Sequence, residues 1–463
     1  MSGGYDVPPE RKETPVRSAL PVLALAALLV AVPAAAAEIV VDVNDTGDYL
    51  TIQEGIDAAS EGDTVLVYPG TYTGEGNRDL SFGLKNLVLR GRDGAEATII
   101  DASFGVHRCM DFGKTGQDTS CVIDGFTMQG GYQSVQYGDG AGIRLDGTVG
   151  SGPGPASPKF VDCIIRDNDN TFGVGGGVYM NTGPSPIFRN VIFEANYAFA
   201  SGGAVYCTQN CNPVFSGCTF TDNQNPPQDS GGAVHCRHGS SPTFINCWFE
   251  GNLAFSGGAV GCYGESSPSL TNCTFIGNTT GGGGEGGGAL YCSDASSPTL
   301  TNCTFYANRV IGEGEGECIY VDDNSHPVLQ RCIFASSGFA PGALSPDEGD
   351  GAAGANLGGA ARPSRSSSFY CEGGATLDVG QSFSYGNAYS DDMCGTVVCG
   401  SGFLTCEDPL FCDPAEGDLT LAATSPCLPA GNAWGVLIGA HGEGCTQPAV
   451  ENASWGAIKA MYR

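Results

Sequence analysis

The sequence has few positively charged residues relative to its negatively charged ones. The chain has 463 residues, of which 20 are Lys or Arg and 50 are Asp or Glu, and its formal net charge is −30. Nucleic acids and anionic lipid surfaces are recognised through basic patches, so neither is an expected partner. Cations and neutral sugars remain open as ligands. A soluble acidic surface with no dedicated cation site is the simpler interpretation.

Helical periodicity and long apolar runs are also missing beyond the N-terminal region. Apolar residues come in short runs broken by Gly, Pro, Asn and Ser, which is typical of strands between turns. The 72 glycines follow no Gly-X-Y period, so the chain is not collagen-like. Recurring Val, Ile, Phe and Tyr argue against a disordered chain. The composition therefore predicts an all-β protein with many tight turns.

The one long apolar run lies near the N-terminus. Arg11, Lys12 and Arg17 precede the run ALPVLALAALLVAV and then PAAAAE, which is the order of regions in an export signal. Residues 1–37 are therefore predicted to be a signal peptide, cleaved near Ala37. The apolar run is too short for a comfortable membrane span, and no later segment is long enough. We expect a secreted or cell-surface protein, associated with the outer membrane, with no transmembrane span after cleavage.

A repeat runs through the middle of the chain. A proline near each Asn-Cys or related pair marks it, and successive markers are 26 to 30 residues apart, at Pro158, Pro186, Pro213, Pro242, Pro268, Pro298 and Pro327. Repeats of this length indicate a solenoid, and the short apolar runs exclude a helical one.

The first half of each repeat is a strand that must bend. In PTFINCWF, Cys247 and Phe249 share one strand face, whereas Phe244 is an odd number of residues from Cys247. Asn246 therefore lies at a corner, because Asn tolerates left-handed backbone angles. A second Asn, three residues after the Phe, predicts a second corner at Asn196, Asn223, Asn252, Asn278 and Asn308.

The second half is a glycine turn followed by a short strand, as in GGAVYC. Val205 and Cys207 should point to one side, and Tyr206 to the other. Five rings hold this outward place in successive repeats, with Gly261 as a gap, and they are the predicted ligand-binding residues: Tyr179, Tyr206, His235, Tyr291 and Tyr320. Such a row suits an extended sugar chain, and the alternative is that the rings only stabilise the sheet.

Short strands, corners and this repeat length together predict a parallel β-helix. Coils stack about 4.8 Å apart, so residues at the same place in successive repeats lie directly above one another in a column. One column contains cysteines, at positions 163, 218, 247, 273, 303 and 332. Free stacked thiols and disulfides between coils both remain open. The total of 21 cysteines fits an oxidising compartment, and being odd it leaves at least one thiol unpaired or paired between chains.

The repeats resemble a known family. The pairing of GGA with FxxN, as in Phe193–Asn196 and Phe249–Asn252, is similar to the repeats of polymorphic outer membrane proteins over roughly residues 160–335. Those proteins are right-handed β-helices on cell surfaces that take part in adhesion, and the resemblance implies that fold and role here.

The N-terminal region resembles another β-helix group. YLTIQEGIDAASEGDTVLVYPGTYTG looks like the entry of pectin-lyase-like proteins. Ile52, Ile56 and Ala59 fall on one side of a short helix that could plug the stack. We therefore expect an N-terminal helical cap and first strand over 38–75 and β-helix repeats over 76–335.

The repeat fails after Pro327. Residues 336–368 are predicted to be a Gly/Ala/Ser-rich loop or linker, 369–445 the last coils and a Cys-rich C-terminal cap, and 446–463 a tail. The segment from Asp408 to Cys445 resembles the closing segment of secreted β-helix proteins. Disulfides are expected in this cap, with a zinc site as the alternative, although paired CxxC is lacking.

We assign no catalytic residue from the sequence. Between residues 190 and 361 the only bases are Arg237, Arg309 and Arg331, none in a close basic-plus-acidic group. The acids of YVDDNSHP, Asp322 and Asp323, suit a corner turn better than a hydrolase site. No metal site and no cofactor are predicted, with calcium left open.

The sequence therefore favours an exported, right-handed, single-stranded parallel β-helix that is non-catalytic and serves in surface adhesion or polysaccharide binding. The partner would be a polysaccharide or cell-surface glycan. One alternative is a polysaccharide lyase or glycoside hydrolase of the pectin-lyase-like group, and the other is a structural envelope protein. A close Arg/Asp or Asp/Asp group in a groove would favour the enzyme.

Overall fold

The computed structural model describes residues 1, 3, 36–134, 139–281, 283, 285–312, 314–335, 368–372, 375–385, 397–399, 404–405, 409–414 and 417–445. The chain divides into two units, Met1–Ala36 and Ala37–Arg463, and the second contains all the elements below. The predicted signal peptide, the insertion at 336–368 and the tail at 446–463 lie outside the described residues, apart from positions 1, 3, 36, 37 and 368.

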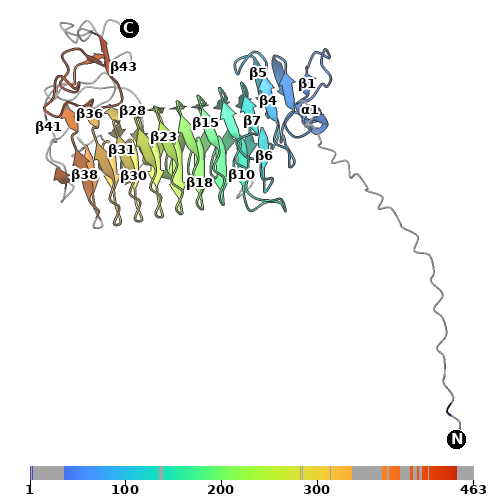
Figure 1. Cartoon of the computed structure of the whole chain (residues 1–463). Helices are drawn as coiled ribbons and strands as arrows, with labels where there is room; N and C mark the ends of the chain where they lie inside the picture. The colour runs from blue at the N-terminus through green and yellow to red at the C-terminus, as the bar shows by residue number, and fades with distance from the viewer. Residues whose placement is uncertain are drawn as a thin grey trace. The chain divides into compact units, whose positions relative to one another are not determined.

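Four sheets of stacked short strands, named A to D here, make up most of the second unit (Figure 1). Sheet A contains β1 (Glu38–Val41), β2 (Thr64–Val67), β4 (Val88–Gly91), β7 (Val122–Asp124), β11 (Lys159–Val161), β15 (Ile187–Arg189), β19 (Val214–Ser216), β23 (Thr243–Ile245), β27 (Ser269–Thr271), β31 (Thr299–Thr301), β35 (Val328–Gln330), β38 (Leu377–Gly380) and β40 (Val397–Cys399). Sheet B contains β3 (Gly70–Thr73), β5 (Thr98–Asp101), β8 (Thr127–Gln129), β12 (Ile164–Arg166), β16 (Ile192–Glu194), β20 (Thr219–Thr221), β24 (Trp248–Glu250), β28 (Thr274–Ile276), β32 (Thr304–Tyr306), β36 (Ile333–Ala335), β39 (Phe383–Tyr385) and β41 (Leu404–Thr405).

The other two sheets begin later in the chain. Sheet C contains β6 (Met110–Phe112), β10 (Ile143–Asp146), β14 (Val178–Asn181), β18 (Val205–Thr208), β22 (Val234–Arg237), β26 (Val260–Cys262), β30 (Leu290–Cys292), β34 (Ile319–Val321) and β37 (Phe369–Cys371). Sheet D contains β9 (Tyr132–Gln133), β13 (Asp169–Asn170), β17 (Tyr197–Ala198), β21 (Gln224–Ser230), β25 (Leu253–Ser256), β29 (Thr279–Thr280) and β33 (Arg309–Val310). Within each sheet every strand pairs in parallel with its equivalent one coil away, as β14 does with β10 and β18. The predicted parallel β-helix is confirmed.

The predicted bend at Asn246 is present. Asn246 has a φ of 53°, in the left-handed region, and Phe244, Cys247 and Phe249 are all buried. The bend therefore lets Phe244 and Cys247, which are an odd number of residues apart, point into the same core. Even Arg331, a poor residue for this conformation, has a φ of 58° at the equivalent corner.

The core consists of columns of identical residues. Phe220, Phe249, Phe275 and Phe305 stack with ring centroids 4.6 to 4.8 Å apart. Cysteines of neighbouring coils also lie in file, since the amide of Thr274 donates to the carbonyl of Cys247 and that of Thr304 to Cys273, both at 2.9 Å. The cysteines of this column are buried free thiols, which decides between the two alternatives for these coils.

The second Asn of each repeat forms a buried ladder. The side-chain amide of Asn223 donates to the Asn252 side-chain oxygen at 3.0 Å and to the carbonyl of Phe193 at 2.9 Å. Asn252 repeats the pattern with Asn278 and Phe220. These side chains are fully buried, so each corner depends on its neighbours for hydrogen bonds.

Helix α1 (Ile52–Ala58) lies beside the first strands (Figure 1). Thr51 and Glu54 form a capping box at its start, and Ile52 and Ile56 are buried, as their spacing predicts. Its role as the cap of the stack stays a prediction, as do the domain boundaries. No helix among the described residues is both long and apolar enough for a membrane crossing.

The C-terminal sheet contains β42 (Phe411–Asp413), β43 (Asp418–Ala422) and β44 (Glu443–Cys445). A disulfide joins Cys412 to Cys445, which agrees with the expectation of crosslinks in this segment. The segment packs on the outer side of sheet B, where the amide of Ala440 donates to the Thr304 hydroxyl at 2.9 Å. Phe411 and Leu421 share an apolar cluster there with Ile333.

Candidate functional site

The five predicted ligand-binding side chains form one column on the outer face of sheet C. Register pairs Tyr179 with Tyr206 and Tyr206 with His235, and further along Tyr291 with Tyr320. The ring centroids of the first two pairs are 5.8 and 5.1 Å apart with nearly parallel planes. The column continues further than the sequence indicates. Tyr263 fills the rung that Gly261 leaves empty, and Tyr370 stacks on Tyr320 at 4.9 Å.

These rings are covered. Their exposed fractions are 6% for Tyr179, 9% for Tyr206, 1% for His235, 2% for Tyr291 and 3% for Tyr320. Glycine turns of the preceding coil approach this column closely in two places, because a Cβ at Gly140 would lie 2.9 Å from the Tyr179 Cβ and one at Gly257 would lie 2.9 Å from the Tyr291 Cβ. A sugar chain cannot stack on faces that are already occupied. Ligand binding by these residues stays a prediction, and the geometry favours the alternative of sheet stabilisation.

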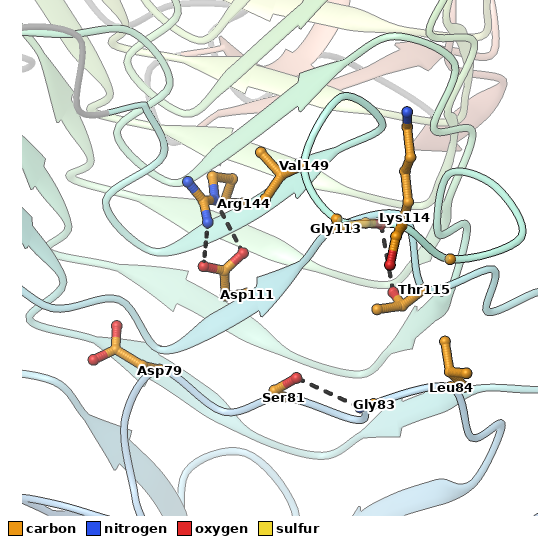
Figure 2. Close-up of a pocket in the computed structure, with 13 residues that line it drawn as sticks. Asp79, Ser81, Gly83, Leu84, Asp111, Gly113, Lys114, Thr115, Arg144 and Val149 are labelled. Atoms are coloured by element: carbon orange, nitrogen blue, oxygen red, sulfur yellow. Dashed lines mark hydrogen bonds and ion pairs between the residues drawn. The ribbon is translucent and has the colours of Figure 1, made fainter.

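An open pocket of about 430 Å³ lies at the start of the same face. Here the outward position is held by Asp111 of β6 and Arg144 of β10, and Arg144 is the register partner of Tyr179. Leu80 bridges to Met110, which places Ser81 beside Asp111 and Asp79 two residues earlier on the same side. Figure 2 shows Arg144 and Asp111 facing each other above the segment that carries Asp79 and Ser81.

The loop after β10 forms one wall of the pocket. The amide of Lys114 donates to the carbonyl of Val149 at 2.6 Å, and the amide of Gly116 to that of Gly154 at 3.0 Å. This approach requires glycine, because a Cβ at Gly152 would lie 1.5 Å from the Lys114 carbonyl oxygen. The wall is therefore specified by the sequence GTVGSGP.

Asp111 and Arg144 form a two-pronged ion pair. Arg144 Nε donates to Asp111 Oδ1 at 3.0 Å, and a terminal nitrogen to Oδ2 at 2.5 Å. Burial opposes the charge of Arg144, but the bonds and charge of Asp111 outweigh it and raise the pKa of Arg144. Both side chains are still about a quarter exposed, at 24% and 26%, so a ligand can reach them.

Asp79 is held from two sides. Its Oδ2 lies 2.6 Å from His107 Nδ1, and its Oδ1 accepts a hydrogen bond from the Arg108 amide at 2.9 Å. The Arg108 side chain turns away and donates to the carbonyl of Gly140 at 2.7 Å. Burial and the nearby Arg144 charge lower the pKa of Arg108.

Helix α1 positions the segment that carries Ser81. The side chain of Gln53 donates to the carbonyl of Ser81 and accepts from its amide, at 2.9 and 3.0 Å. Lys85 Nζ donates to the carbonyls of Ile56 and Ala59, where a cation suits the end of a helix. The floor of the pocket is thus fixed before any ligand arrives.

The rim of the pocket is apolar. Leu84 is 66% exposed and Val149 is 40% exposed, and both lie on the pocket lining. The surrounding segment is also nearly neutral, because residues 78–144 hold seven Lys and Arg against eight Asp and Glu, whereas residues 145–335 hold six against sixteen. Of these two segments, residues 78–144 are therefore the less repulsive to an anionic ligand.

Sequence reasoning missed these residues because it searched for bases only between residues 190 and 361. Aligning GIRLD with GVYMN and AVYCT would place Arg144 in the column of Tyr179 and Tyr206. A charged residue, Arg144, at a position that aromatic residues hold in later repeats could have indicated this site.

The weaker candidates behave as corners. Asp323 and Asn324 have φ of 45° and 56°, and His326 Nδ1 lies 2.7 Å from the Thr376 hydroxyl. Within the part of the chain that the structure describes, no three His, Cys, Asp or Glu side chains are placed to hold one metal ion. Calcium stays open.

The comparisons agree with the fold. The family model described as right handed beta helix region matches residues 115–275 and 229–345, in agreement with the parallel β-helix. No curated protein matches the chain. The resemblance to polymorphic outer membrane proteins stays a prediction.

Three solved structures are similar at low identity. A pectin methylesterase from carrot is 13% identical over 80% of this chain and 88% of its own, with a TM-score of 0.33. Pectate lyase Pel9A is 16% identical over 66% and 78%, with a TM-score of 0.40. A mannuronic acid specific family 6 polysaccharide lyase from human gut microbiota is 9% identical over 81% and 91%, with a TM-score of 0.30.

Proposed function

We propose that this chain is an exported β-helix protein that binds a polysaccharide chain in the pocket lined by Asp79, Ser81, Asp111 and Arg144. The Asp111–Arg144 pair, open to solvent at the end of an otherwise covered face, is the observation that carries the proposal. A carboxylate accepts hydrogen bonds from sugar hydroxyls, and a guanidinium donates hydrogen bonds to sugar oxygens or carboxylates. Leu84 and Val149 offer apolar contact for the ring faces of a sugar. Secretion or display at the cell surface, outer membrane included, is part of the proposal.

An anionic polysaccharide fits this pocket better than a neutral one. Lys114 also lines the pocket and adds a second positive charge to it. The near-neutral segment around the pocket spares an anion the repulsion that the rest of the chain would exert. Binding alone would serve adhesion to a glycan-coated surface.

Cleavage of the polysaccharide is the second candidate, favoured by the two carboxylates on one side of the pocket. Asp79 and Asp111 are diagonal neighbours on adjacent coils, a relation that places Cα atoms about 7–8 Å apart. In glycoside hydrolases the two carboxyl groups themselves are about 5–9.5 Å apart, a separation that two Asp side chains at this Cα spacing are long enough to adopt. We therefore retain a hydrolase or lyase activity as the alternative.

Incubation of the purified protein with polygalacturonate, alginate and neutral glycans, with and without calcium, tests both candidates. Retention of the glycan by the protein without cleavage products supports binding. Release of shorter glycan chains supports the enzyme. The variant Arg144→Ala should retain an anionic glycan at least tenfold less strongly, whereas Arg90→Ala, which removes the partner of Asp124 in another ion pair, should leave glycan retention unchanged. Equal retention by both variants, or none by the wild type, removes this proposal.

A further inference from the structure

A second aromatic group lies on the outer face of sheet D, and it is open. Asp169 pairs in register with Tyr132 on one side and with Tyr197 on the other. The next residue of each strand is buried, so these three side chains point outward together. Phe199, two residues after Tyr197, shares the same side. We call these residues, with Phe172, the sheet D patch.

The rings of the sheet D patch are accessible, unlike those of sheet C. Phe172 is 57% exposed, and Tyr132, Tyr197 and Phe199 are half-buried. The centroids of Phe172 and Phe199 are 6.3 Å apart, with their planes tilted by 40°. Exposed aromatic rings gathered in one place mark recognition surfaces more often than chance exposure does.

The carboxylate of Asp169 lies between the rings without a counter-charge. No Lys or Arg of the described residues forms an ion pair with it, and the nearby Arg166 pairs with Asp167 instead, at 3.7 Å. Its Oδ1 is buried and has no hydrogen-bond partner. Burial raises the pKa of Asp169, and burial together with the Asp169 charge raises the pKa of Tyr197.

We propose that the sheet D patch binds an alkylammonium group, of the kind carried by choline. Aromatic faces attract a cation through their quadrupole, and a carboxylate beside them supplies the opposite charge. A quaternary ammonium has no N–H to satisfy, so it fits a site that offers ring faces and one anionic group. The acidic surface of the chain also attracts cations towards the site.

Choline and its neutral carbon isostere, 3,3-dimethyl-1-butanol, are the probes for the test. The two molecules have the same shape, so their difference isolates the charge. Calorimetric titration of the whole chain at constant ionic strength should show choline binding at least tenfold more tightly than the isostere. This comparison uses the wild type and needs no variant to fold.

Variants then locate the site. Asp169→Asn and Tyr197→Leu should each weaken choline binding at least tenfold, and Tyr197→Phe should retain it, because the ring remains. Asp167→Asn is the matched control, two residues away and already paired with Arg166. It should bind choline as the wild type does.

Three results would overturn this inference. They are no choline binding, equal binding of choline and its isostere, and unchanged binding in Asp169→Asn. Binding of a neutral oligosaccharide that is lost in Tyr197→Leu but kept in Asp169→Asn would reassign the patch to sugars. None of these outcomes bears on the pocket at Arg144, which is tested separately with Arg144→Ala.

Discussion

The outer face of sheet C has two regions that share one register and differ in what covers them. Its first two rungs carry Asp111 and Arg144, which line an open pocket. Its later rungs carry Tyr179, Tyr206, Tyr291 and Tyr320, which are covered. The strands are equivalent, so the turns and loops between them decide which side chains reach solvent. One strand position is therefore open to solvent in one region and packed in the other.

The buried cysteines inside the β-helix give the largest expected effect, which is a dependence of the free energy of unfolding on pH. Burial raises the pKa of Cys121, Cys163 and Cys211 to about 12 each. The unfolded chain ionises these thiols at about 8.5, so their stabilisation is complete below that pH and is lost as pH rises towards the folded value. The three thiols together should cost roughly 3–4 kcal/mol of unfolding free energy between pH 9 and 10.

Urea unfolding at pH 8, 9 and 10 under reducing conditions measures that loss. The variant Cys163→Ala should show a shallower dependence on pH than the wild type. A free energy of unfolding that does not change over this range would mean that the thiols are not buried in neutral form.

The second effect tests the covered region. Tyr291→Ala removes a ring from the middle of the column and should lower the free energy of unfolding by about 3 kcal/mol. Glycan retention should not change, because the ring is only 2% exposed. Tyr49→Ala, at a position 37% exposed, is the control for losing a tyrosine. Lost retention with unchanged stability would restore the sugar-binding role predicted for the column.

The third effect tests the open region. Arg144→Ala should weaken glycan retention by about tenfold to a hundredfold, the range expected when hydrogen bonds to charged groups are lost. Arg90→Ala breaks the ion pair with Asp124 in sheet A, away from the pocket, and should stay within about twofold of the wild type. Affinity electrophoresis in gels that contain the glycan compares the two, and equal retardation would contradict the site.

The smallest effect concerns the rim of the pocket. Leu84→Ser and Val149→Ser should weaken retention a few-fold and change the free energy of unfolding by less than about 0.5 kcal/mol, since both side chains are exposed. Ile311→Ser is the control, at a position 45% exposed on another coil. Retention as strong as the wild type in both rim variants would limit the site to its polar floor.

Much of the fold could be predicted because a solenoid repeats its information in every coil. The odd spacing of Phe244 and Cys247 required a bend, and Asn246 supplies it with a φ of 53°. The Asn positions predicted corners, and the ladder at Asn223 and Asn252 forms there. In each case local backbone chemistry determines the result, so residue type and spacing were sufficient.

The site could not be predicted in the same way, because it depends on contacts between coils. Tyr263 lies two residues after Gly261, just past the end of β26, and its ring fills the place that Gly261 leaves empty, which no column alignment shows. Tyr370 follows Tyr320 only after a long insertion that hides the repeat. The tyrosines are buried by neighbours on adjacent coils, among them the stacked rings and the glycine turns at Gly140 and Gly257. The pocket depends on the irregular loop after β10.

Hydrogen–deuterium exchange of the whole chain with and without an anionic oligosaccharide tests the central claim most directly. Our account predicts protection at residues 79–84, 111–115 and 147–152, with no change in the turns that cover Tyr206 and Tyr291. Protection confined to those turns, with the pocket segments unchanged, would contradict it.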